Sequence, residues 1–184
     1  MSAPSPHAAL APSAWVQRWS HLVPAGGGVL DVACGSGRHV RWFHARGCSV
    51  TGVDRDAAAI APLSGIAETV IADIENGPWP LAGRRFDCVV VTNYLWRTLL
   101  PTIVDSVAIG GVLIYETFSA GNESVGKPSN PDFLLRPQEL LQAVTGLRVV
   151  AFEDGYLSDP ERFVQRIAAV REAPGTPAAA RYPL

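Results

Sequence analysis

The chain has 184 residues, of which 48% are hydrophobic and 17% are charged, and its formal net charge is -2. This composition is typical of one globular domain and excludes an intrinsically disordered chain. The small negative charge excludes a polybasic protein, so a nucleic acid would have to bind to a local patch, and no nucleic-acid partner is expected.

The first part of the chain alternates apolar runs with helix-like segments. Ser13 is predicted to cap a first helix, in which Trp15 and Trp19 share one face. Short apolar runs, which predict strands buried on both faces, lie at 29–32, 48–53, 69–72, 86–92 and 112–118. Helices are predicted after Gly37, over 56–63 and over 99–108. Strands that alternate with helices indicate a parallel sheet with both faces covered.

The pattern changes after residue 118. A long polar loop, 119–136, precedes a short predicted helix at 137–144. Two strand-like runs, 147–156 and 162–170, are separated by Asp159-Pro160, which is typical of a turn, so they are expected to form an antiparallel hairpin. The predicted fold is α/β: a doubly wound, mostly parallel seven-stranded sheet with a C-terminal antiparallel hairpin.

Domain organisation follows from the composition of the two ends. Both ends are rich in Ala and Pro, which predicts flexible tails at 1–12 and 172–184 around a single domain, 13–171. The N-terminus lacks the basic start and apolar run of a signal peptide, and no run of 18 apolar residues is present. We therefore expect a cytoplasmic protein with no membrane partner.

Cysteine and histidine spacing predicts neither a metal site nor a disulfide framework. The three cysteines, Cys34, Cys48 and Cys88, form no C-x-x-C pair, and no H-E-x-x-H segment occurs. No bound metal is expected.

The most informative segment runs from Val29 to His39, where a predicted strand enters a glycine-rich turn before a helix. Glycines let the backbone approach a ligand closely. Asp31 lies on the strand just before this turn, where its carboxylate would repel a pyrophosphate but attract an ammonium group. Asp54 ends the next strand, where an acid commonly binds the two hydroxyls of a ribose. S-adenosylmethionine, with an amino acid at one end and a nucleoside at the other, satisfies both acids.

Five segments resemble, in order, the motifs of the class I S-adenosylmethionine-dependent methyltransferases. They are 29–39, 51–54, 71–74, 86–93 and 110–113, and the resemblance spans residues 27–118. The whole chain resembles the small bacterial methyltransferases grouped with the tellurite-resistance methyltransferase. This resemblance implies a Rossmann-like fold, S-adenosylmethionine as cofactor, and transfer of the sulfonium methyl by in-line displacement.

The resemblance also implies a set of cofactor-binding residues. In it, Asp73 would meet the adenine amino group and the backbone N–H of Ile74 would meet the ring, while Arg38 would either reach the methionine carboxylate or face solvent. The complete set is Asp31, Ala33, Gly35, Gly37, Arg38, Asp54, Arg55, Asp73, Ile74 and Asn93. Each acid has a structural alternative as a turn cap or a solvated side chain. His39 is either a packed histidine or a base.

No catalytic residue follows from the sequence, because methyl transfer depends mainly on the alignment of a nucleophile. After the fourth strand, 92–96 lacks the paired prolines of enzymes that methylate exocyclic amines of bases, and no cysteine fits a pyrimidine C5 nucleophile. Asp87 alone does not supply the carboxylates of metal-dependent catechol methylation. A small-molecule acceptor is expected, in a pocket walled by Tyr94, Trp96, Arg97, Tyr115 and Glu116. The loop 119–136 would be its lid or a mere surface excursion.

Two other functions stay open. One is an RNA- or protein-directed methyltransferase that docks its partner near Arg84, Arg85 and Arg97, and the other is a non-catalytic S-adenosylmethionine-binding protein. An NAD-dependent oxidoreductase is disfavoured, because Val40 stands where a third glycine would be and the second mononucleotide-binding half is missing. The oligomeric state is left open.

Overall fold

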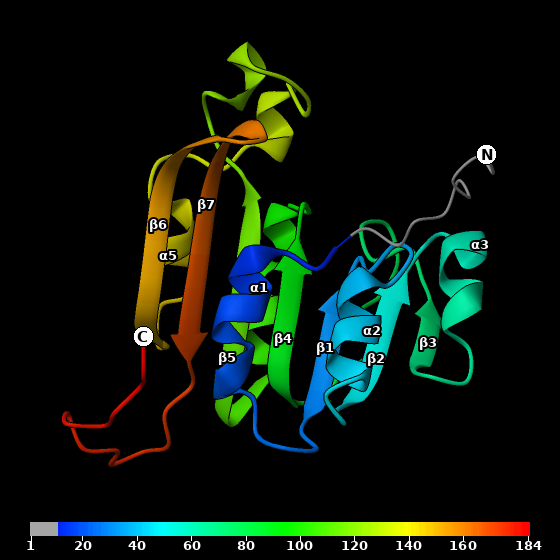
Figure 1. The fold of residues 1–184 in the computed structure, drawn as a ribbon, viewed down its shortest axis with the longest axis vertical. Helices are drawn as coiled ribbons and strands as arrows, with labels where there is room; N and C mark the ends of the chain where they lie inside the picture. Colours follow the sequence, from blue (N-terminus) through cyan, green and yellow to red (C-terminus); the bar gives the residue numbers. More distant parts are fainter. Residues whose placement is uncertain (1–10) are drawn as a thin grey trace, which may run out of the picture.

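The computed structural model describes residues 11–184, which form one seven-stranded sheet in the order β3-β2-β1-β4-β5-β7-β6 (Figure 1). The strands are β1 (Gly28–Val32), β2 (Ser49–Asp54), β3 (Glu68–Ile71), β4 (Phe86–Thr92), β5 (Val107–Phe118), β6 (Arg148–Ser158) and β7 (Glu161–Val170). The first five are parallel, and β7 runs antiparallel to both β5 and β6. The predicted fold, a mostly parallel seven-stranded sheet with a C-terminal antiparallel hairpin, is confirmed.

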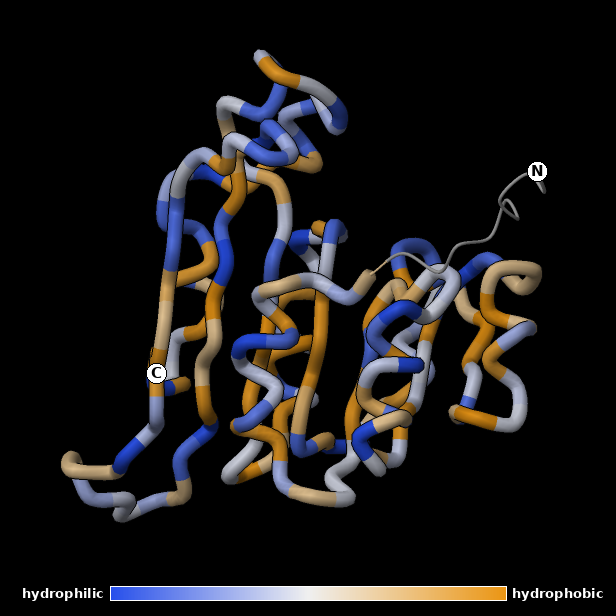
Figure 2. Tube along the Cα trace, viewed as in Figure 1, coloured by the Kyte–Doolittle hydropathy of each residue, from blue (hydrophilic) through white to orange (hydrophobic). Residues whose placement is uncertain are grey.

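Helices cover both faces of this sheet, as the apolar runs predicted. The helices of residues 11–184 are α1 (Ala14–Trp19), α2 (Arg38–His44), α3 (Ala57–Ile60), α4 (Leu100–Asp105) and α5 (Glu139–Ala143). One core cluster joins the sheet to α4 and α5, and the other joins its opposite face to α1, α2 and α3. Hydrophobic residues follow the central strands between these layers (Figure 2).

Helix α1 begins where its capping residue was predicted. The Ser13 hydroxyl oxygen accepts hydrogen bonds from the backbone N–H groups of Trp15 and Val16. The Trp15 indole N–H donates to the carbonyl of Ile167 at 3.2 Å. The first helix is therefore tied to β7, the last strand of the chain.

Strand β5 starts five residues earlier than predicted, and the helix before it is shorter. The prediction treated Gly110-Gly111 as a turn into the strand, whereas both residues lie inside it. A Cβ atom on Gly111 would come within 2.9 Å of the Phe86 carbonyl oxygen, so glycine permits the close approach of β4. The register between β4 and β5 shifts there, and the irregularity lets one strand continue through the glycine pair.

The loop 119–136 is folded back on itself. Its ends meet in a bridge between Ser119 and Leu135, and short 3-10 turns lie at Asn122–Ser124 and Pro131–Phe133. Asn122 is buried, donates to the Pro128 carbonyl and accepts the backbone N–H of Phe163 in β7. The loop thus forms a closed lobe packed against the hairpin, beyond the carboxyl end of β5 (Figure 1).

Of the two predicted tails, the C-terminal one lies wholly within the described residues. Residues 1–10 lie outside the described part of the chain. Residues 172–184 carry no helix or strand, yet the Tyr182 hydroxyl donates to Glu172 and the Arg148 guanidinium lies 5.5 Å from the Tyr182 ring centre. No helix within residues 11–184 has the length and apolar character needed to cross a bilayer.

Candidate active site

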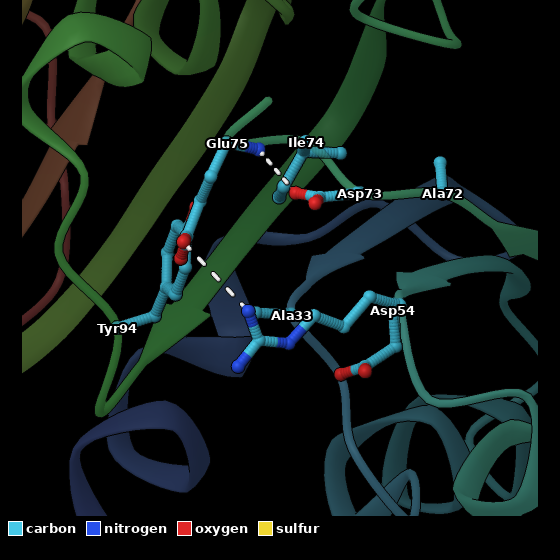
Figure 3. A pocket seen from close by; sticks show the side chains of 8 residues that line it. Ala33, Asp54, Ala72, Asp73, Ile74, Glu75 and Tyr94 are labelled. Carbon is cyan, nitrogen blue, oxygen red and sulfur yellow. Dashed lines mark hydrogen bonds and ion pairs between the residues drawn. The ribbon is translucent and has the colours of Figure 1, made fainter. Parts of the chain in front are cut away.

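A pocket of about 200 Å³ opens at the carboxyl ends of the parallel strands (Figure 3). Its lining comes from the segments that follow or end β1, β2, β3 and β4: Ala33, Asp54, Arg55, Ala72, Asp73, Ile74, Glu75 and Tyr94. Ligands of open α/β sheets bind at this edge. The pocket brings together half of the predicted cofactor-binding residues.

Asp54 joins the second strand to the glycine-rich turn. Its Oδ2 accepts the backbone N–H of Gly35 at 2.7 Å, and its Oδ1 accepts that of Asp56 at 2.9 Å. The carboxylate lines the pocket while it holds the turn in place. Asp54 therefore shapes the site, and its contact with a ligand stays a prediction.

The turn itself depends on left-handed backbone conformations. Ala33, Gly35 and Gly37 have φ values of 53°, 53° and 76°. A Cβ atom on Gly37 would clash with Leu63, at 2.5 Å, whereas no atom of residues 11–184 lies within 4 Å of a Cβ built on Gly35. Gly37 is therefore required for packing against Leu63, and Gly35 leaves open space beside its backbone.

Asp31 is a buried acid with an unused oxygen. Its exposed fraction is 2%, and its Oδ2 has no hydrogen-bond partner among residues 11–184. The Nδ1 of His39 lies 3.9 Å from that oxygen, which is too far for a hydrogen bond. Burial raises the pKa of Asp31 to about 7, an effect that Arg38 opposes and Asp54 reinforces. A buried carboxylate oxygen without a partner lowers the stability of the folded protein unless a hydrogen-bond donor reaches it.

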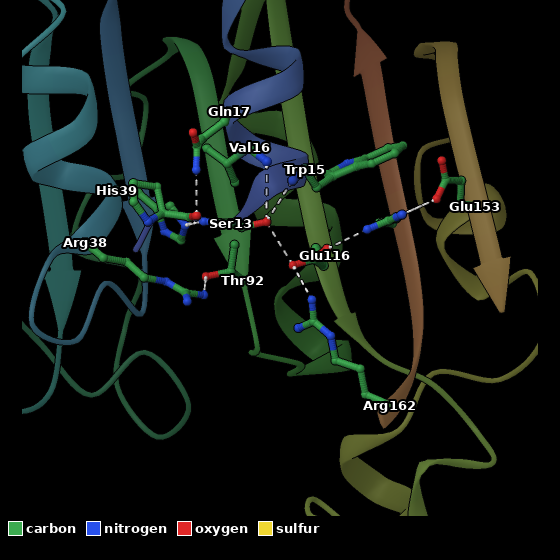
Figure 4. Close-up of polar contacts among 12 residues, drawn as sticks. Ser13, Trp15, Val16, Gln17, Arg38, His39, Thr92, Glu116, Glu153 and Arg162 are labelled. Carbon is green, nitrogen blue, oxygen red and sulfur yellow. Dashed lines mark hydrogen bonds and ion pairs between the residues drawn. The ribbon is translucent and has the colours of Figure 1, made fainter. Parts of the chain in front are cut away.

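His39 is neutral and is held through its other nitrogen. Burial, with a smaller contribution from Arg38, lowers the pKa of His39 to about 3. Its Nε2 accepts the backbone N–H of Ser13 at 3.1 Å (Figure 4). Because Nε2 is an acceptor, the ring proton is on Nδ1 and points towards Asp31.

The far side of the pocket is built by the segment after β3. The Asp73 carboxylate accepts the Asn76 side-chain amide and the backbone N–H groups of Glu75 and Asn76, and these hydrogen bonds lower its pKa. Arg55 and Glu75 form an ion pair across the pocket, with 3.8 Å between Nη1 and Oε2. Sequence reasoning missed Ala72 and Glu75, whose only signal was their position beside Asp73.

The remaining predicted cofactor residues lie near the pocket without lining it. Arg38 donates to the Thr92 hydroxyl at 3.3 Å, at the end of β4. Asn93 has a left-handed φ of 54°, and its backbone N–H donates to the Glu116 carbonyl at 2.9 Å. Their cofactor contacts, with those of Asp31, Gly35 and Gly37, stay predictions.

The predicted acceptor residues do not form one wall. Tyr94 lines the pocket described above, and its hydroxyl is buried with no partner within residues 11–184. Tyr115 and Glu116 are neighbours on β5 and so face opposite sides of the sheet. The Tyr115 hydroxyl donates to the Tyr94 carbonyl at 2.8 Å, on the side of α4. Trp96 packs against the core on that same side.

Arg97 anchors the loop 119–136. It donates to both carboxylate oxygens of Glu139, at 2.7 and 3.0 Å, and to the carbonyls of Asp132 and Leu134, both at 2.7 Å. These four acceptors occupy the guanidinium. In the structure Arg97 therefore holds the loop against α5, and a direct contact with an acceptor stays a prediction.

Glu116 lies in a polar group on the side of α1 (Figure 4). It is 1% exposed, and its Oε1 accepts the Ser13 hydroxyl at 3.0 Å. Arg166 approaches its other oxygen at 3.4 Å, and Arg162 lies 3.8 Å from Oε1. Sequence reasoning placed Glu116 at the site but did not pair it with Ser13, because the two are far apart in the chain.

Metal chemistry has no candidate among residues 11–184, where no three His, Cys, Asp or Glu side chains gather as ligands. Burial raises the thiol pKa of Cys34, so this cysteine in the glycine-rich turn is a neutral thiol and a poor nucleophile.

Comparisons with known proteins agree with this geometry. Residues 29–109 match the family model described as "Methyltransferase domain". No curated protein sequence matches the chain significantly.

Several solved structures share the fold at low sequence identity. TehB from Haemophilus influenzae is 20% identical, with a TM-score of 0.67, and the match covers 86% of this chain and 61% of TehB. A TehB-like SAM-dependent methyltransferase from Corynebacterium glutamicum is 18% identical, with a TM-score of 0.64 and coverages of 86% and 87%. A SAM-dependent methyltransferase from Methanosarcina mazei is 16% identical, with a TM-score of 0.66 and coverages of 89% and 100%.

This chain spans about three fifths of the TehB chain, most of the Corynebacterium glutamicum chain and all of the Methanosarcina mazei chain. The family match, the strand order and the pocket at the carboxyl edge of the sheet agree: residues 29–109 resemble a methyltransferase domain, and the chain has the fold of TehB and of other S-adenosylmethionine-dependent methyltransferases.

Proposed function

We propose that the protein transfers a methyl group from S-adenosylmethionine to a small-molecule acceptor. One observation carries the proposal: a buried carboxylate without a partner, Asp31, stands at the end of β1 next to a pocket lined by the Asp54 carboxylate of β2. The first acid suits an ammonium group and the second suits ribose hydroxyls. A dinucleotide would instead bring a pyrophosphate against Asp31.

The residues present fit the cofactor. The unused Oδ2 of Asp31 would receive the ammonium, Asp54 retains free lone pairs for hydroxyl donors, and Ala72 and Ile74 offer apolar surface to the base. The open space beside Gly35 would let the ligand pass close to the backbone. When bound, S-adenosylmethionine supplies a methyl group already activated by the sulfonium charge.

The protein's own contribution is to bind, orient and exclude water. Alignment of two reactants can supply most of the rate of such a transfer. Burial raises the pKa of the Tyr94 phenol, so at neutral pH this group is a hydrogen-bond donor rather than a base. His39 is engaged by Ser13, and the Glu116 carboxylate accepts from Ser13 and faces two arginines.

A small-molecule acceptor is supported by the lobe formed by the loop 119–136. The lobe is closed at its neck and anchored by Arg97. A closed lobe beside the carboxyl ends of β4 and β5 would narrow the approach of an acceptor. The net charge of -2 also opposes a nucleic-acid substrate.

Ligand-dependent melting tests the cofactor directly. A ligand that binds only the folded state stabilises it by about 2.7 kcal/mol at 100 times its dissociation constant. For a domain of this size, each kcal/mol raises the melting temperature by about 2–4 °C. We expect S-adenosylmethionine to raise it by roughly 5–11 °C and NAD to leave it unchanged. The opposite ranking would exclude the proposed function.

The acceptor requires a second measurement. Transfer of labelled methyl groups should be screened against thiols, amines, carboxylates and oxyanions, with RNA and protein as separate arms. Labelling of a small molecule is expected. Labelling of RNA or protein alone would replace the small-molecule acceptor by a macromolecular one, and binding without any transfer would indicate a non-catalytic binding protein.

A further inference from the structure

A chain of buried polar contacts connects the proposed cofactor site to the start of α1. It runs from the Asp31 Oδ2 to the His39 Nδ1 across 3.9 Å, which is too far for a hydrogen bond, and then through two hydrogen bonds: from the Ser13 backbone N–H to the His39 Nε2 and from the Ser13 hydroxyl to Glu116. All four side chains are at most 9% exposed. Ser13 thereby joins α2, which follows β1, to the end of β5, and residues 11–13 form a strap across the carboxyl edge of the sheet.

Ser13 also determines how α1 begins. Besides the two amides that its hydroxyl caps, its carbonyl accepts the backbone N–H of Gln17 at 2.9 Å. The amides of Trp15, Val16 and Gln17 therefore report directly on the position of Ser13.

The histidine tautomer provides the link between the two ends. When Asp31 is ionised, the His39 proton is drawn to Nδ1, which leaves Nε2 free to accept from Ser13. When Asp31 is protonated, this attraction is lost, and the ring proton can move to Nε2, against the Ser13 N–H. An ammonium group beside Asp31 favours the ionised carboxylate and so favours the bond to Ser13.

We propose that Ser13 and His39 are positioning residues that couple occupancy of the ammonium site at Asp31 to closure of the strap. This coupling, which we call the latch, rests on the proposed function because it requires a ligand with an ammonium group. It assigns His39 a role different from that of a base: the ring does not touch the acceptor and acts through Ser13.

The charged groups around the latch do not take the place of the ligand's ammonium group beside Asp31. Arg38 from α2 and Asp54 from β2 act on Asp31 in opposite directions. The neighbouring thiols, Cys34 after β1 and Cys88 on β4, are neutral because burial raises their pKa. On the other side Ser13 meets Glu116, which Arg166 and Arg162 hold in place.

Two ligands separate the latch from ordinary binding. S-adenosylhomocysteine carries the ammonium group, and methylthioadenosine lacks it. Hydrogen exchange of the amides at 15–17 is compared at equal saturation with each ligand. Since a hydrogen bond contributes about 1 kcal/mol net, we expect S-adenosylhomocysteine to slow exchange roughly three- to tenfold more than methylthioadenosine does.

Two variants separate the two sides of the histidine ring, Nδ1 towards Asp31 and Nε2 towards Ser13. In His39→Asn the amide reaches only as far as Nδ1, so it still faces Asp31, but nothing accepts from Ser13. We expect the extra protection to vanish, and the affinity for S-adenosylhomocysteine to fall by the same factor, because coupling is reciprocal. In His39→Gln the amide oxygen can take the place of Nε2, so the strap is protected whether or not ligand is bound.

Ser20→Ala is the matched control. Ser20 is equally buried at the other end of α1, and its hydroxyl donates to the Gln17 carbonyl without contacting the latch. This variant should keep the difference between the two ligands. Equal protection by both ligands in the unaltered protein, full extra protection in His39→Asn, or a loss of affinity above a hundredfold in that variant would overturn the latch. If neither ligand binds the unaltered protein, the proposed function itself fails.

Discussion

In the proposed function, Asp31 would bind the ligand at a cost to the stability of the ligand-free fold. Hydrogen bonds to charged groups contribute about 1.5–3 kcal/mol, so Asp31→Asn should weaken S-adenosylmethionine binding by about 10- to 150-fold. Methylthioadenosine, which has no ammonium, should bind the same variant almost normally. Calorimetry with both ligands checks this, and equal losses for the two ligands would show that Asp31 only holds the turn.

Asp54 provides the contrasting residue. It offers oxygens to the pocket and also accepts the Gly35 N–H. Asp54→Ala should therefore weaken both ligands, and it should also loosen the glycine-rich turn. Asp54→Asn keeps one acceptor oxygen and should retain part of the affinity. The comparison is a set of calorimetric titrations of both variants, and a normal affinity for methylthioadenosine in Asp54→Ala would remove Asp54 from the nucleoside site.

Two buried groups give the ligand-free protein opposite pH dependences. The folded-state pKa of Asp31 is raised from 3.8 to about 7, so the folded state binds the extra proton and stability is lost as pH rises from about 4 to 7. The folded-state pKa of His39 is lowered from 6.5 to about 3, so stability is lost as pH falls through that range. The two contributions nearly cancel between about pH 4 and 6.5.

Single variants should expose each contribution. Relative to the unaltered protein, Asp31→Asn should gain stability from pH 5 to 8, by roughly 4 kcal/mol at most. His39→Phe removes the acceptor of the Ser13 N–H, so it should lose that hydrogen bond at every pH. Its stability relative to the unaltered protein should nevertheless increase as the pH falls towards 4.5. Urea unfolding at several pH values measures both, and variant curves that run parallel to that of the unaltered protein would contradict the assignment.

At the scale of single residues, the sequence predicted which side chains at the carboxyl ends of the strands would lie together. Asp54, Asp73 and Ile74 line the pocket because a parallel sheet brings its carboxyl ends together. The pairing of Ser13 with Glu116 could not be predicted, because it depends on the path of α1 over the sheet. Likewise, nothing in a linear sequence shows that four acceptors occupy the Arg97 guanidinium.

Among the elements, the loop 119–136 gains its order from Arg97. Arg97→Ala removes the bonds to Glu139, Asp132 and Leu134, and it should destabilise the protein by about 2–3 kcal/mol. Limited proteolysis within 119–136 should accelerate, while the affinity for S-adenosylhomocysteine should stay within about twofold. Arg85→Ala is the control, since within the described part of the chain this exposed side chain donates only to the Arg84 carbonyl. A large loss of affinity in Arg97→Ala would instead make the loop part of the cofactor pocket.

The element boundaries show where local patterns are insufficient. Strand β4 has the predicted bounds, because its apolar run is continuous. Strand β5 extends past Gly110-Gly111, where glycine meets the β4 backbone instead of turning the chain. Inside the loop 119–136, the buried Asn122 and its contact with Phe163 follow from tertiary packing, which a polar loop sequence does not reveal.

For the whole molecule, the place of β7 between β5 and β6 governs the order in which the fold can be completed. The parallel strands and their helices can assemble early, but the β5 edge stays open until the last strand arrives. Likewise, the hydrogen bond of the Trp15 indole can form only once Ile167, 152 residues later in the chain, is in place. Such long-range closure slows folding and leaves an aggregation-prone edge exposed during synthesis. A chain emerging from the ribosome would therefore be most vulnerable just before its final strand is released.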